Sequence, residues 1–359
     1  MVCEECNHCV KGFFKDNPEA YTCVDGSDIT PIQSLGNDCS RYLPGDNHNH
    51  SLNWFNLNLA SDSSYYGELK PPTLYMLVGL PGCGKTTIAN RIIESDPTVV
   101  HISSDAIRGR LWGDENCQNN PAEVFRVMNE ETLSILNDGF SVVYDATNIN
   151  RKDRRGILEK LPSWVRKECL ICWAPFDVCV ERDKMRDRSV GNHVISRMLR
   201  RFEAPYYDEG FDRIQVIISD VHYSMTQYYI DLISATNIPH DNPHHRANIM
   251  EHCRLCGVGL IDSNVPDVVM IAGFLHDIGK PYCKTFVNKK GETTETAHYY
   301  DHESVGAWLS YGIEGQSPTL AWLISTHMAP YINKKYYESL PPLWKRWIDE
   351  LHRADLEAH

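Results

Sequence analysis

The chain has 359 residues, a net charge of −13, a hydrophobic fraction of 42% and 13 cysteines. This length suits two domains or slightly more, each with a sizeable core. The negative charge argues against non-specific binding to duplex nucleic acid, although a local basic groove remains compatible with it. No apolar run approaches the roughly 20 residues of a membrane span, and the first residues show no signal-peptide pattern. We therefore expect a soluble, cytoplasmic protein.

The first 39 residues hold five of the cysteines. In a reducing compartment such a cluster favours a metal over disulfides. Four thiolates are enough for a structural Zn²⁺, and the candidate ligands are Cys6, Cys9, Cys23 and Cys39. Cys3 competes with Cys9 for the first pair, His8 is a further candidate, and free or buried thiols are the alternative. We expect a Cys-rich, zinc-binding module over residues 1–45, followed by a linker over 46–72.

Between residues 73 and 222, apolar runs typical of buried strands alternate with helical patterns. The expected strands are TLYMLVG, TVVHIS, SVVYDAT, ECLICWA and RIQVIIS. Helices are expected from Lys85 and over 121–138, 151–160 and 175–203. This alternation predicts a parallel sheet in a three-layer α/β domain.

From residue 223 to 359 the strand patterns stop and helical patterns follow one another. Asn242–Pro243 and Pro342 are start signals, and glycines at 257, 279 and 312 are stop signals. The five expected helical segments are NPHHRANIMEHCRLCG, PDVVMIAGFLHDIGK, DHESVGAWLSYG, TLAWLISTHMAP and PPLWKRWIDELHRADLEAH. The second domain is therefore predicted to be all-α.

Residues 79–86, GLPGCGKT, fit the pattern G-x-x-x-x-G-K-[ST] between a strand and a helix, which is the context that this phosphate-binding motif requires. Its glycines let backbone N–H groups surround phosphates, Lys85 reaches the β- and γ-phosphates, and Thr86 holds Mg²⁺. ATP and Mg²⁺ are thus the expected cofactors. The expected nucleotide-binding residues are Gly79, Gly82, Cys83, Gly84, Lys85, Thr86 and Thr87.

Polar residues also follow the second and third expected strands, at the edge where ligands bind in open α/β sheets. Asp105 in SSDAIRGRL can accept a proton from an attacking hydroxyl, and Arg108 can hold a phosphate bidentately. The alternative is that Asp105 caps a helix and Arg108 is a surface residue. Asp145 ends the third strand, in VVYDATNINRKDRR.

Farther along, ERDKMRDRSVG carries Arg182, Arg186 and Arg188 on a predicted polar helix. Such a helix can close as a lid whose arginine stabilises the transferring charge, and a solvated charged face is the alternative.

Together, GLPGCGKT, SSDAIR, DATNINRKDRR and ERDKMRDRSV resemble the phage-type 5′-hydroxyl polynucleotide kinases over residues 73–220. The resemblance implies that Lys85 and Thr86 serve ATP and Mg²⁺. It further implies that Asp105 is the general base for a 5′-OH and that Arg108 clamps the phosphate of the acceptor.

The same resemblance implies Arg186 as the lid arginine, with Arg182 and Arg188 as alternatives. Asp145 matches an acidic position that serves either the acceptor site or a metal-bound water. Because related P-loop kinases also phosphorylate small molecules, the acceptor stays open.

In the second domain, six His and Asp side chains fall on five predicted helices: His252, His276, Asp277, His302, His327 and Asp355. A lone buried histidine is more often a satisfied structural residue. Polar groups on several apolar helix faces of one domain, however, predict a metal pair in a bundle core. Mixed imidazole and carboxylate ligands suit one or two ions of Mn²⁺, Fe²⁺, Co²⁺, Ni²⁺ or Zn²⁺.

GFLHDIGKP followed by AHYYDHESVGA resembles the HD phosphohydrolases, especially the HD domain of bacterial CCA-adding enzymes, over roughly 240–359. The resemblance implies two-metal hydrolysis of a phosphomonoester or a 2′,3′-cyclic phosphate. Lys280 either contacts the phosphate or is a charge at a helix C-terminus. His245 is an alternative to His252 as the first ligand.

The pairing resembles fusions of an HD domain with a polynucleotide kinase. We therefore expect a P-loop kinase domain over 73–222 and an HD phosphohydrolase domain over 223–359. The expected enzyme phosphorylates 5′-OH ends and removes 2′,3′-cyclic or 2′/3′-phosphates from RNA or DNA, with a separate RNA ligase as a candidate partner. One rival is a small-molecule or nucleotide kinase fused to a nucleotide phosphohydrolase, in metabolism or antiphage defence. Another is a nucleotide-sensing protein with inactive sites.

Overall fold

The computed structural model describes residues 71–358 except for 116, 118, 220–223, 243–246 and 314–316. It also describes the backbone of two short strands, β1 (Cys9–Lys11) and β2 (Tyr21–Cys23), which pair antiparallel with Cys9 opposite Cys23. The rest of the predicted zinc module and residues 46–70 of the linker lie outside the described residues, as do Cys3, Cys6, His8 and Cys39. The zinc site therefore stays a prediction.

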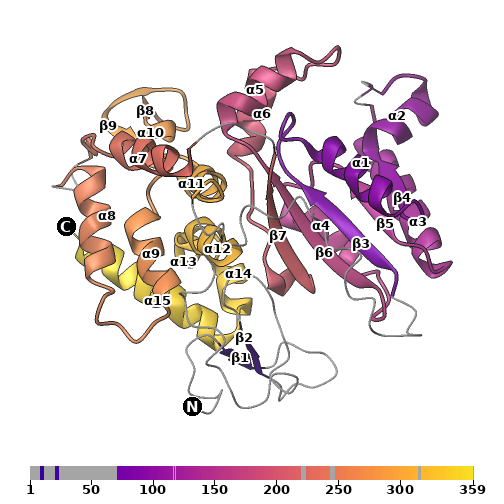
Figure 1. Cartoon of the computed structure of the whole chain (residues 1–359). Helices are drawn as coiled ribbons and strands as arrows, with labels where there is room; N and C mark the ends of the chain where they lie inside the picture. Colours follow the sequence, from indigo (N-terminus) through magenta and orange to yellow (C-terminus); the bar gives the residue numbers. More distant parts are fainter. Residues whose placement is uncertain are drawn as a thin grey trace.

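Five parallel strands form the sheet of the first domain, in the order β4-β5-β3-β6-β7. Their residues are largely buried, as expected where helices cover a parallel sheet. Figure 1 shows β7 at the edge nearest the second domain. Each predicted strand is present, so the α/β fold is confirmed. The strands are β3 (Thr73–Val78), β4 (Val100–Ser103), β5 (Val142–Asp145), β6 (Arg166–Trp173) and β7 (Arg213–Ile218).

The helices of this domain begin and end largely where the sequence signals predict. Pro121 is the first residue of α3, where its missing N–H removes no helical hydrogen bond. A separate helix, α2, was not predicted, and its N-cap is Ser103, whose hydroxyl accepts from the backbone N–H of Asp105. The elements are α1 (Lys85–Ser95), α2 (Ser104–Trp112), α3 (Pro121–Asn137), α4 (Arg151–Leu158), α5 (Phe176–Lys184), α6 (Asn192–Leu199) and the 3-10 turn η5 (Tyr207–Glu209).

The second domain is helical, which confirms its predicted class. It begins with α7, which the sequence patterns did not indicate. The helices are α7 (Met225–Ala235), α8 (Ile249–Val258), α9 (Asp267–Leu275), α10 (Lys280–Cys283), α11 (His302–Ser310), α12 (Pro318–Thr326), α13 (Ala329–Ile332), α14 (Lys334–Ser339) and α15 (Pro342–Glu357).

Two details of the second domain differ from expectation. Helix α8 begins at Ile249, because Asn248 caps it by accepting from Glu251 N–H, rather than at Asn242–Pro243. A hairpin of β8 (Thr285–Val287) and β9 (Thr293–His298) interrupts the helices. In the described part of the chain, no helix is both long enough and apolar enough to cross a membrane.

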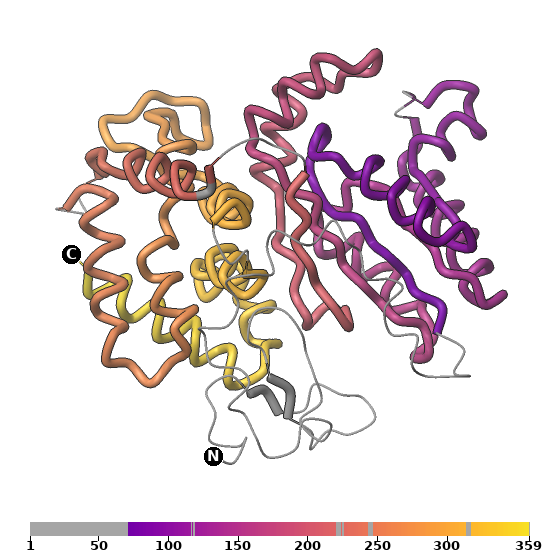
Figure 2. Tube along the Cα trace, in the orientation of Figure 1, coloured from indigo at the N-terminus to yellow at the C-terminus, as the bar shows by residue number. Residues whose placement is uncertain are grey.

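The two domains lie side by side (Figure 2), and buried residues from both form one continuous hydrophobic core. The indole Nε1 of Trp173, at the end of β6, donates to Trp308 O at 2.8 Å. The ring of Phe202 meets Trp308 edge-on at 5.3 Å between centroids, and Tyr206 stacks on Trp322 at 4.4 Å. Because these large side chains are buried by residues from both domains, the domains are held in a fixed relation.

Candidate phosphate-binding and metal sites

The loop between β3 and α1 has the geometry of a phosphate-binding loop. Gly82 and Gly84 have φ of 82° and 95°, a region that favours glycine. A Cβ on Gly82 would lie 2.2 Å from Cys179 O, so a side chain cannot be accommodated there. Lys85 opens α1, and its Nζ donates to Gly79 O at 3.1 Å and Leu80 O at 2.9 Å. The ammonium is therefore folded over the loop that it would share with a phosphate.

The neighbouring predicted residues divide by exposure. Cys83 is buried, and burial raises the pKa of its thiol. Thr86 and Thr87 are exposed at the start of α1. The Thr86 hydroxyl donates to Asp145 Oδ2 at 3.3 Å. In P-loop NTPases, a loop hydroxyl and a strand-end carboxylate hold Mg²⁺ together. Of the two roles open to Asp145, the geometry therefore favours Mg²⁺ binding over the acceptor site.

A residue that the sequence reasoning missed also contacts Asp145. His101 on β4 places Nε2 3.2 Å from the same Oδ2. In the sequence, the signal that could have found it is a histidine within the mostly apolar run of this strand. Strand β4 pairs with β5 in the sheet, which brings His101 close to Asp145.

Asp105 and Arg108 lie together in the first turns of α2. Arg108 Nη1 is 2.5 Å from Asp105 Oδ1, and the Asp105 side chain is 48% exposed. Since Ser103 provides the helix cap, the carboxylate of Asp105 is left to face solvent and Arg108. A solvent-facing carboxylate beside a guanidinium is chemically suited to an acceptor hydroxyl and its phosphate.

The three lid arginines do not share one helix. Helix α5 carries Arg182 but ends at Lys184, so Arg186 and Arg188 lie in the following turn. Asp183 stabilises this turn. Its carboxylate accepts from the hydroxyl of Ser189 and from the backbone N–H groups of Val190 and Gly191. Burial alone would raise the pKa of Asp183, but these donors hold it below its ordinary value.

Their contacts also differ. Arg182 Nη1 donates to Ser219 Oγ at 2.7 Å, and Ser219 lies against Gly84 of the phosphate loop. Arg186 is exposed, and Arg188 forms an ion pair with Glu115. The structure thus places Arg182 beside the loop, whereas the sequence analysis had favoured Arg186.

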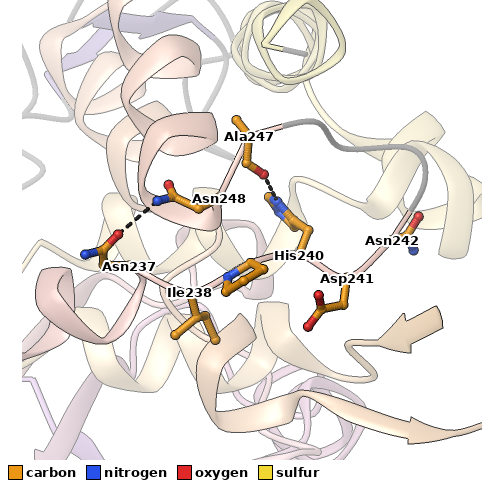
Figure 3. Close-up of a pocket in the computed structure, with 8 residues that line it drawn as sticks. Asn237, Ile238, His240, Asp241, Asn242, Ala247 and Asn248 are labelled. Carbon is orange, nitrogen blue, oxygen red and sulfur yellow. Dashed lines mark hydrogen bonds between the residues drawn. The ribbon is translucent and has the colours of Figure 1, made fainter. Parts of the chain in front are cut away.

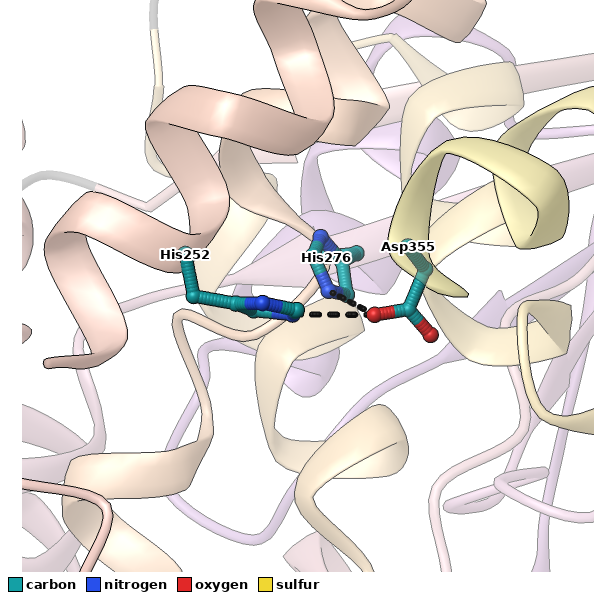
Figure 4. A group of neighbouring side chains, drawn as sticks. All are labelled: His252, His276 and Asp355. Atoms are coloured by element: carbon teal, nitrogen blue, oxygen red, sulfur yellow. Dashed lines mark ion pairs between the residues drawn. The ribbon is translucent and has the colours of Figure 1, made fainter. Parts of the chain in front are cut away.

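The six predicted metal ligands of the second domain come together as two adjoining groups, one of His252, His276 and Asp355 and another of Asp277, His302 and His327. Figure 4 shows the first group, in which Asp355 Oδ1 lies 2.9 Å from His252 Nε2 and 3.4 Å from His276 Nε2. Asp277 connects the groups, because its Oδ2 lies 3.3 Å from His276 Nε2 and its Oδ1 lies 3.3 Å from His302 Nε2.

The four histidines are oriented by the backbone. Each Nδ1 lies 2.7–2.9 Å from a carbonyl oxygen: Ala358 for His252, Gly273 for His276, Tyr299 for His302 and Ile324 for His327. A carbonyl only accepts, so Nδ1 carries a hydrogen, and Nε2 is the ring nitrogen that is left to bind a metal. This backbone contact is how metal-binding histidines are commonly held.

Local folding explains two of these contacts. His276 and His327 are the C-cap residues of α9 and α12, with the same backbone angles of φ −56° and ψ −31°. The last carbonyls of a helix lack intrahelical partners, and each histidine donates to the carbonyl three residues earlier. The end of a helix therefore satisfies its own backbone and aims Nε2 at the same time.

The Nε2 and carboxylate atoms of the centre lie close to one another. His276 Nε2 lies 3.3 Å from Asp277 Oδ2, and His302 Nε2 lies 3.2 Å from His327 Nε2. Lone pairs at such distances repel unless a cation or a proton lies between them. The donor set and its geometry therefore fit divalent cations.

The pKa shifts of the centre also favour a bound cation. Burial would raise the pKa of Asp277, but Lys280 and His276 hold it well below its ordinary value. Burial lowers the pKa of His327 to about 3, with His302 and His276 adding to this. Burial would also lower the pKa of His276, yet Asp277 raises it well above its usual range. Without a metal, a proton on His276 supplies the positive charge that the carboxylates attract.

Lys280 is the first residue of α10 and is 8% exposed, with Nζ 2.6 Å from Asp277 Oδ2. Its charge is therefore held against a buried carboxylate. His245 lies outside the described residues. His240, which the sequence reasoning missed, is buried beside Lys280 and His252. It lines a cavity of about 620 Å³ with residues 237–242, 247 and 248 (Figure 3).

Comparison with known families divides the chain as its fold does. Residues 74–205 match the AAA domain family, and residues 244–354 match the HD domain family. The chain is thus a fusion of a P-loop kinase domain with an HD domain, as the sequence predicted. The two domains imply an enzyme with phosphotransfer and phosphohydrolase chemistry, using ATP with Mg²⁺ in the first and divalent metal in the second.

No curated protein matches the chain. Among solved structures, 45% of the chain is similar to 52% of a chain in the Pnkp1/Rnl/Hen1 RNA repair complex, at 21% identity and TM-score 0.35. A fungal RNA kinase is similar over 47% of this chain and 87% of its own, at 19% identity and TM-score 0.32. A gluconokinase from Sinorhizobium meliloti 1021 is similar over 43% and 86%, at 18% identity and TM-score 0.32. The alignment spans about half of the RNA repair chain.

Proposed function

We propose that this protein repairs nucleic-acid ends, by phosphorylating a 5′-OH in its first domain and removing a 2′,3′-cyclic phosphate or a 2′/3′-phosphate in its second. The observation that carries the proposal is that one chain holds a phosphate loop beside an exposed Asp–Arg pair and also a six-ligand metal centre. RNA cleavage that leaves a 5′-OH and a cyclic phosphate produces both substrates at one break. The two activities would not cancel, because they act on opposite ends.

In the first domain, each proposed role follows from a contact. Lys85 would neutralise the β- and γ-phosphates of ATP, and Thr86 with Asp145 would hold Mg²⁺. Asp105 accepts the proton of the 5′-OH as that oxygen attacks the γ-phosphate. Arg108, paired with Asp105, orients this carboxylate and binds the first phosphate of the acceptor strand. This arrangement supports a phosphorylated acceptor over a neutral one.

In the second domain, four imidazole Nε2 atoms and two carboxylates would hold divalent metal, and Asp277 lies between the two groups of candidate ligands. Divalent cations, when bound, supply Lewis acidity and activate water. Lys280 neutralises the phosphate being cleaved. The Asp355 side chain is 21% exposed, whereas the side chains of the neighbouring candidate ligands His252, His276 and Asp277 are buried. The substrate is therefore expected to approach from the side of Asp355.

The direct test is a short RNA that carries a 5′-OH and a 2′,3′-cyclic phosphate, incubated with ATP, Mg²⁺ and Mn²⁺. Mass analysis of both ends should show a gained 5′-phosphate and an opened or removed cyclic phosphate. A matched DNA with a 5′-OH and a 3′-phosphate would establish the choice between RNA and DNA. If both ends stay unchanged while mononucleotides are turned over, the nucleotide kinase–phosphohydrolase alternative replaces this proposal.

A further inference from the structure

The ammonium of Lys280 lies in a buried cage beside the metal centre. Its Nζ is 2.6 Å from Asp277 Oδ2, 3.4 Å from His240 Nε2 and 5.4 Å from the centroid of the Tyr299 ring. A carboxylate, a neutral ring nitrogen and an aromatic face are all groups that attract an ammonium. Removal of a charge from water is costly unless nearby groups compensate for it. These three groups therefore hold the ammonium of Lys280 at this position.

The backbone orients the His240 side of this cage. His240 Nδ1 lies 2.9 Å from Ala247 O, as Figure 3 shows. Because the carbonyl only accepts, Nδ1 donates and Nε2 is the acceptor that faces Lys280. The hydroxyl of Tyr299 donates to the backbone carbonyl of His240, so both cage residues are tied together. His240 thus meets Lys280 through a fixed tautomer and a fixed ring position.

The other cage member, Asp277, is one of the proposed metal ligands. When its oxygens bind metal, less of its charge is available to Lys280, and His240 and Tyr299 remain to hold the ammonium beside the centre. We propose that His240, supported by Tyr299, is a positioning residue that keeps Lys280 where it binds the phosphate oxygens of the substrate. This inference rests on the proposed phosphohydrolase function of the second domain and assigns its phosphate-binding device.

Two purely structural roles for His240 compete with this inference. The first is to brace the backbone at residues 237–242 against residues 247 and 248, where Asn248 Nδ2 also donates to Asn237 Oδ1 at 2.9 Å. The second is to support the ring of His252, whose centroid lies 5.4 Å away. The first role needs only the bond to Ala247, and the second would act through metal binding.

Two amide variants separate these roles. His240→Asn can keep the bond to Ala247 but has no atom that reaches Lys280, whereas the longer His240→Gln can present an oxygen to Lys280. We expect His240→Asn to lower kcat/KM for hydrolysis by about 10- to 100-fold, the range for a hydrogen bond to a charged group. His240→Gln should recover a large part of this loss. If Asn is tolerated and Gln is not, His240 only braces the loop and the proposal fails.

A double-mutant cycle tests whether His240 acts through Lys280. In a Lys280→Met background, His240→Asn should cause no further loss, because the group that it positions is gone. Additive losses would overturn the proposal. Lys290→Met, on the exposed hairpin turn, is the control lysine and should leave hydrolysis unchanged.

Two substrates distinguish a failure of the proposed end repair from a failure of the role proposed for His240. Hydrolysis is followed with Mn²⁺ on both the cyclic-phosphate RNA and bis(p-nitrophenyl) phosphate. Turnover of the chromogenic ester alone rejects the RNA substrate but leaves the His240 comparison intact. Binding of inorganic phosphate to the Mn²⁺-loaded protein adds a readout without turnover, and His240→Asn should weaken it about 10-fold or more. Unchanged phosphate binding, or a loss of bound Mn²⁺ in His240→Asn, would overturn the proposal.

Discussion

The phosphate loop and the metal centre are built in opposite ways. The loop is one continuous stretch, residues 79–86, whose main functional groups are backbone N–H groups and one lysine that bonds within the same segment. The proposed metal centre draws its six candidate ligands from the ends and faces of α8, α9, α11, α12 and α15, and most of these residues are buried. The groups of a contiguous site are placed by the local backbone, whereas the groups of a dispersed site come together only when the helices pack correctly.

The strongest test of this difference is to remove the residue shared by both ligand groups. Asp277→Ala should lower hydrolysis at least about 100-fold, because loss of a ligand exceeds the 10- to 100-fold effect of outer contacts. Phosphorylation of the 5′-OH should continue, because the phosphate loop lies in the other domain. Mn²⁺ binding and both end reactions would be measured on the folded variant. Loss of both activities would contradict two separate sites.

The reciprocal change tests the first domain. Asp105→Asn should reduce phosphorylation by about 10²- to 10⁴-fold, the usual contribution of a general base. Hydrolysis by the second domain should stay at the wild-type rate. Asp114→Asn lies in the same region of the chain and is the matched control. A kinase rate that is unchanged in Asp105→Asn would remove Asp105 from its proposed role.

For the catalytic arginine of the first domain, the motif resemblance implies Arg186, whereas the contacts in the structure favour Arg182. Arg182 bonds to Ser219 beside the phosphate loop, whereas Arg186 is exposed in the following turn. We expect Arg182→Ala to reduce the kinase kcat more than Arg186→Ala, by about tenfold or more. If closure of the lid brings Arg186 to the phosphates, the order of the two variants will be reversed, and the motif-based assignment will be correct.

Two histidines of the proposed metal centre should link stability to pH in opposite directions. In metal-free protein, the pKa of His276 is raised, so its stabilisation is present below the unfolded value of about 6.5 and is lost as pH rises. The pKa of His327 is lowered to about 3, so its contribution is lost as pH falls below about 6.5.

Unfolding midpoints measured in chelator should therefore peak near pH 6.5. Added Mn²⁺ should stabilise the protein most above this pH, where it replaces the proton of His276. A midpoint that rises steadily from pH 6.5 to 8.5 in chelator would contradict this account.

The smallest expected effect concerns the contact between the domains. Trp173→Phe keeps the aromatic packing but removes the bond from Nε1 to Trp308 O. The free energy of unfolding should fall by about 1 kcal/mol, measured by urea denaturation. Trp164→Phe is the control, because Trp164 is half exposed. Separate unfolding transitions for the two domains in the wild type would contradict a shared core.

The sequence predicted more of the first domain than of the second. Every strand of the sheet was anticipated, because a buried parallel strand is a short, continuous apolar run. The β8–β9 hairpin was missed, because its residues are mostly polar and lie on the surface. Helix α7 was missed too, and α8 was expected to begin too early, because an Asn–Pro pair resembled a helix start while Asn248 provides the actual cap.

By itself, the sequence determined the phosphate loop, the order of the two domains and the identity of the six candidate ligands, because each depends on local spacing or on polar residues at apolar positions. Only the tertiary structure decided that Asp277 spans both ligand groups, that Arg182 rather than Arg186 lies beside the phosphate loop, and that His240 faces Lys280. These contacts join residues from different turns, helices and loops, so they depend on helix ends and loop paths that only packing sets.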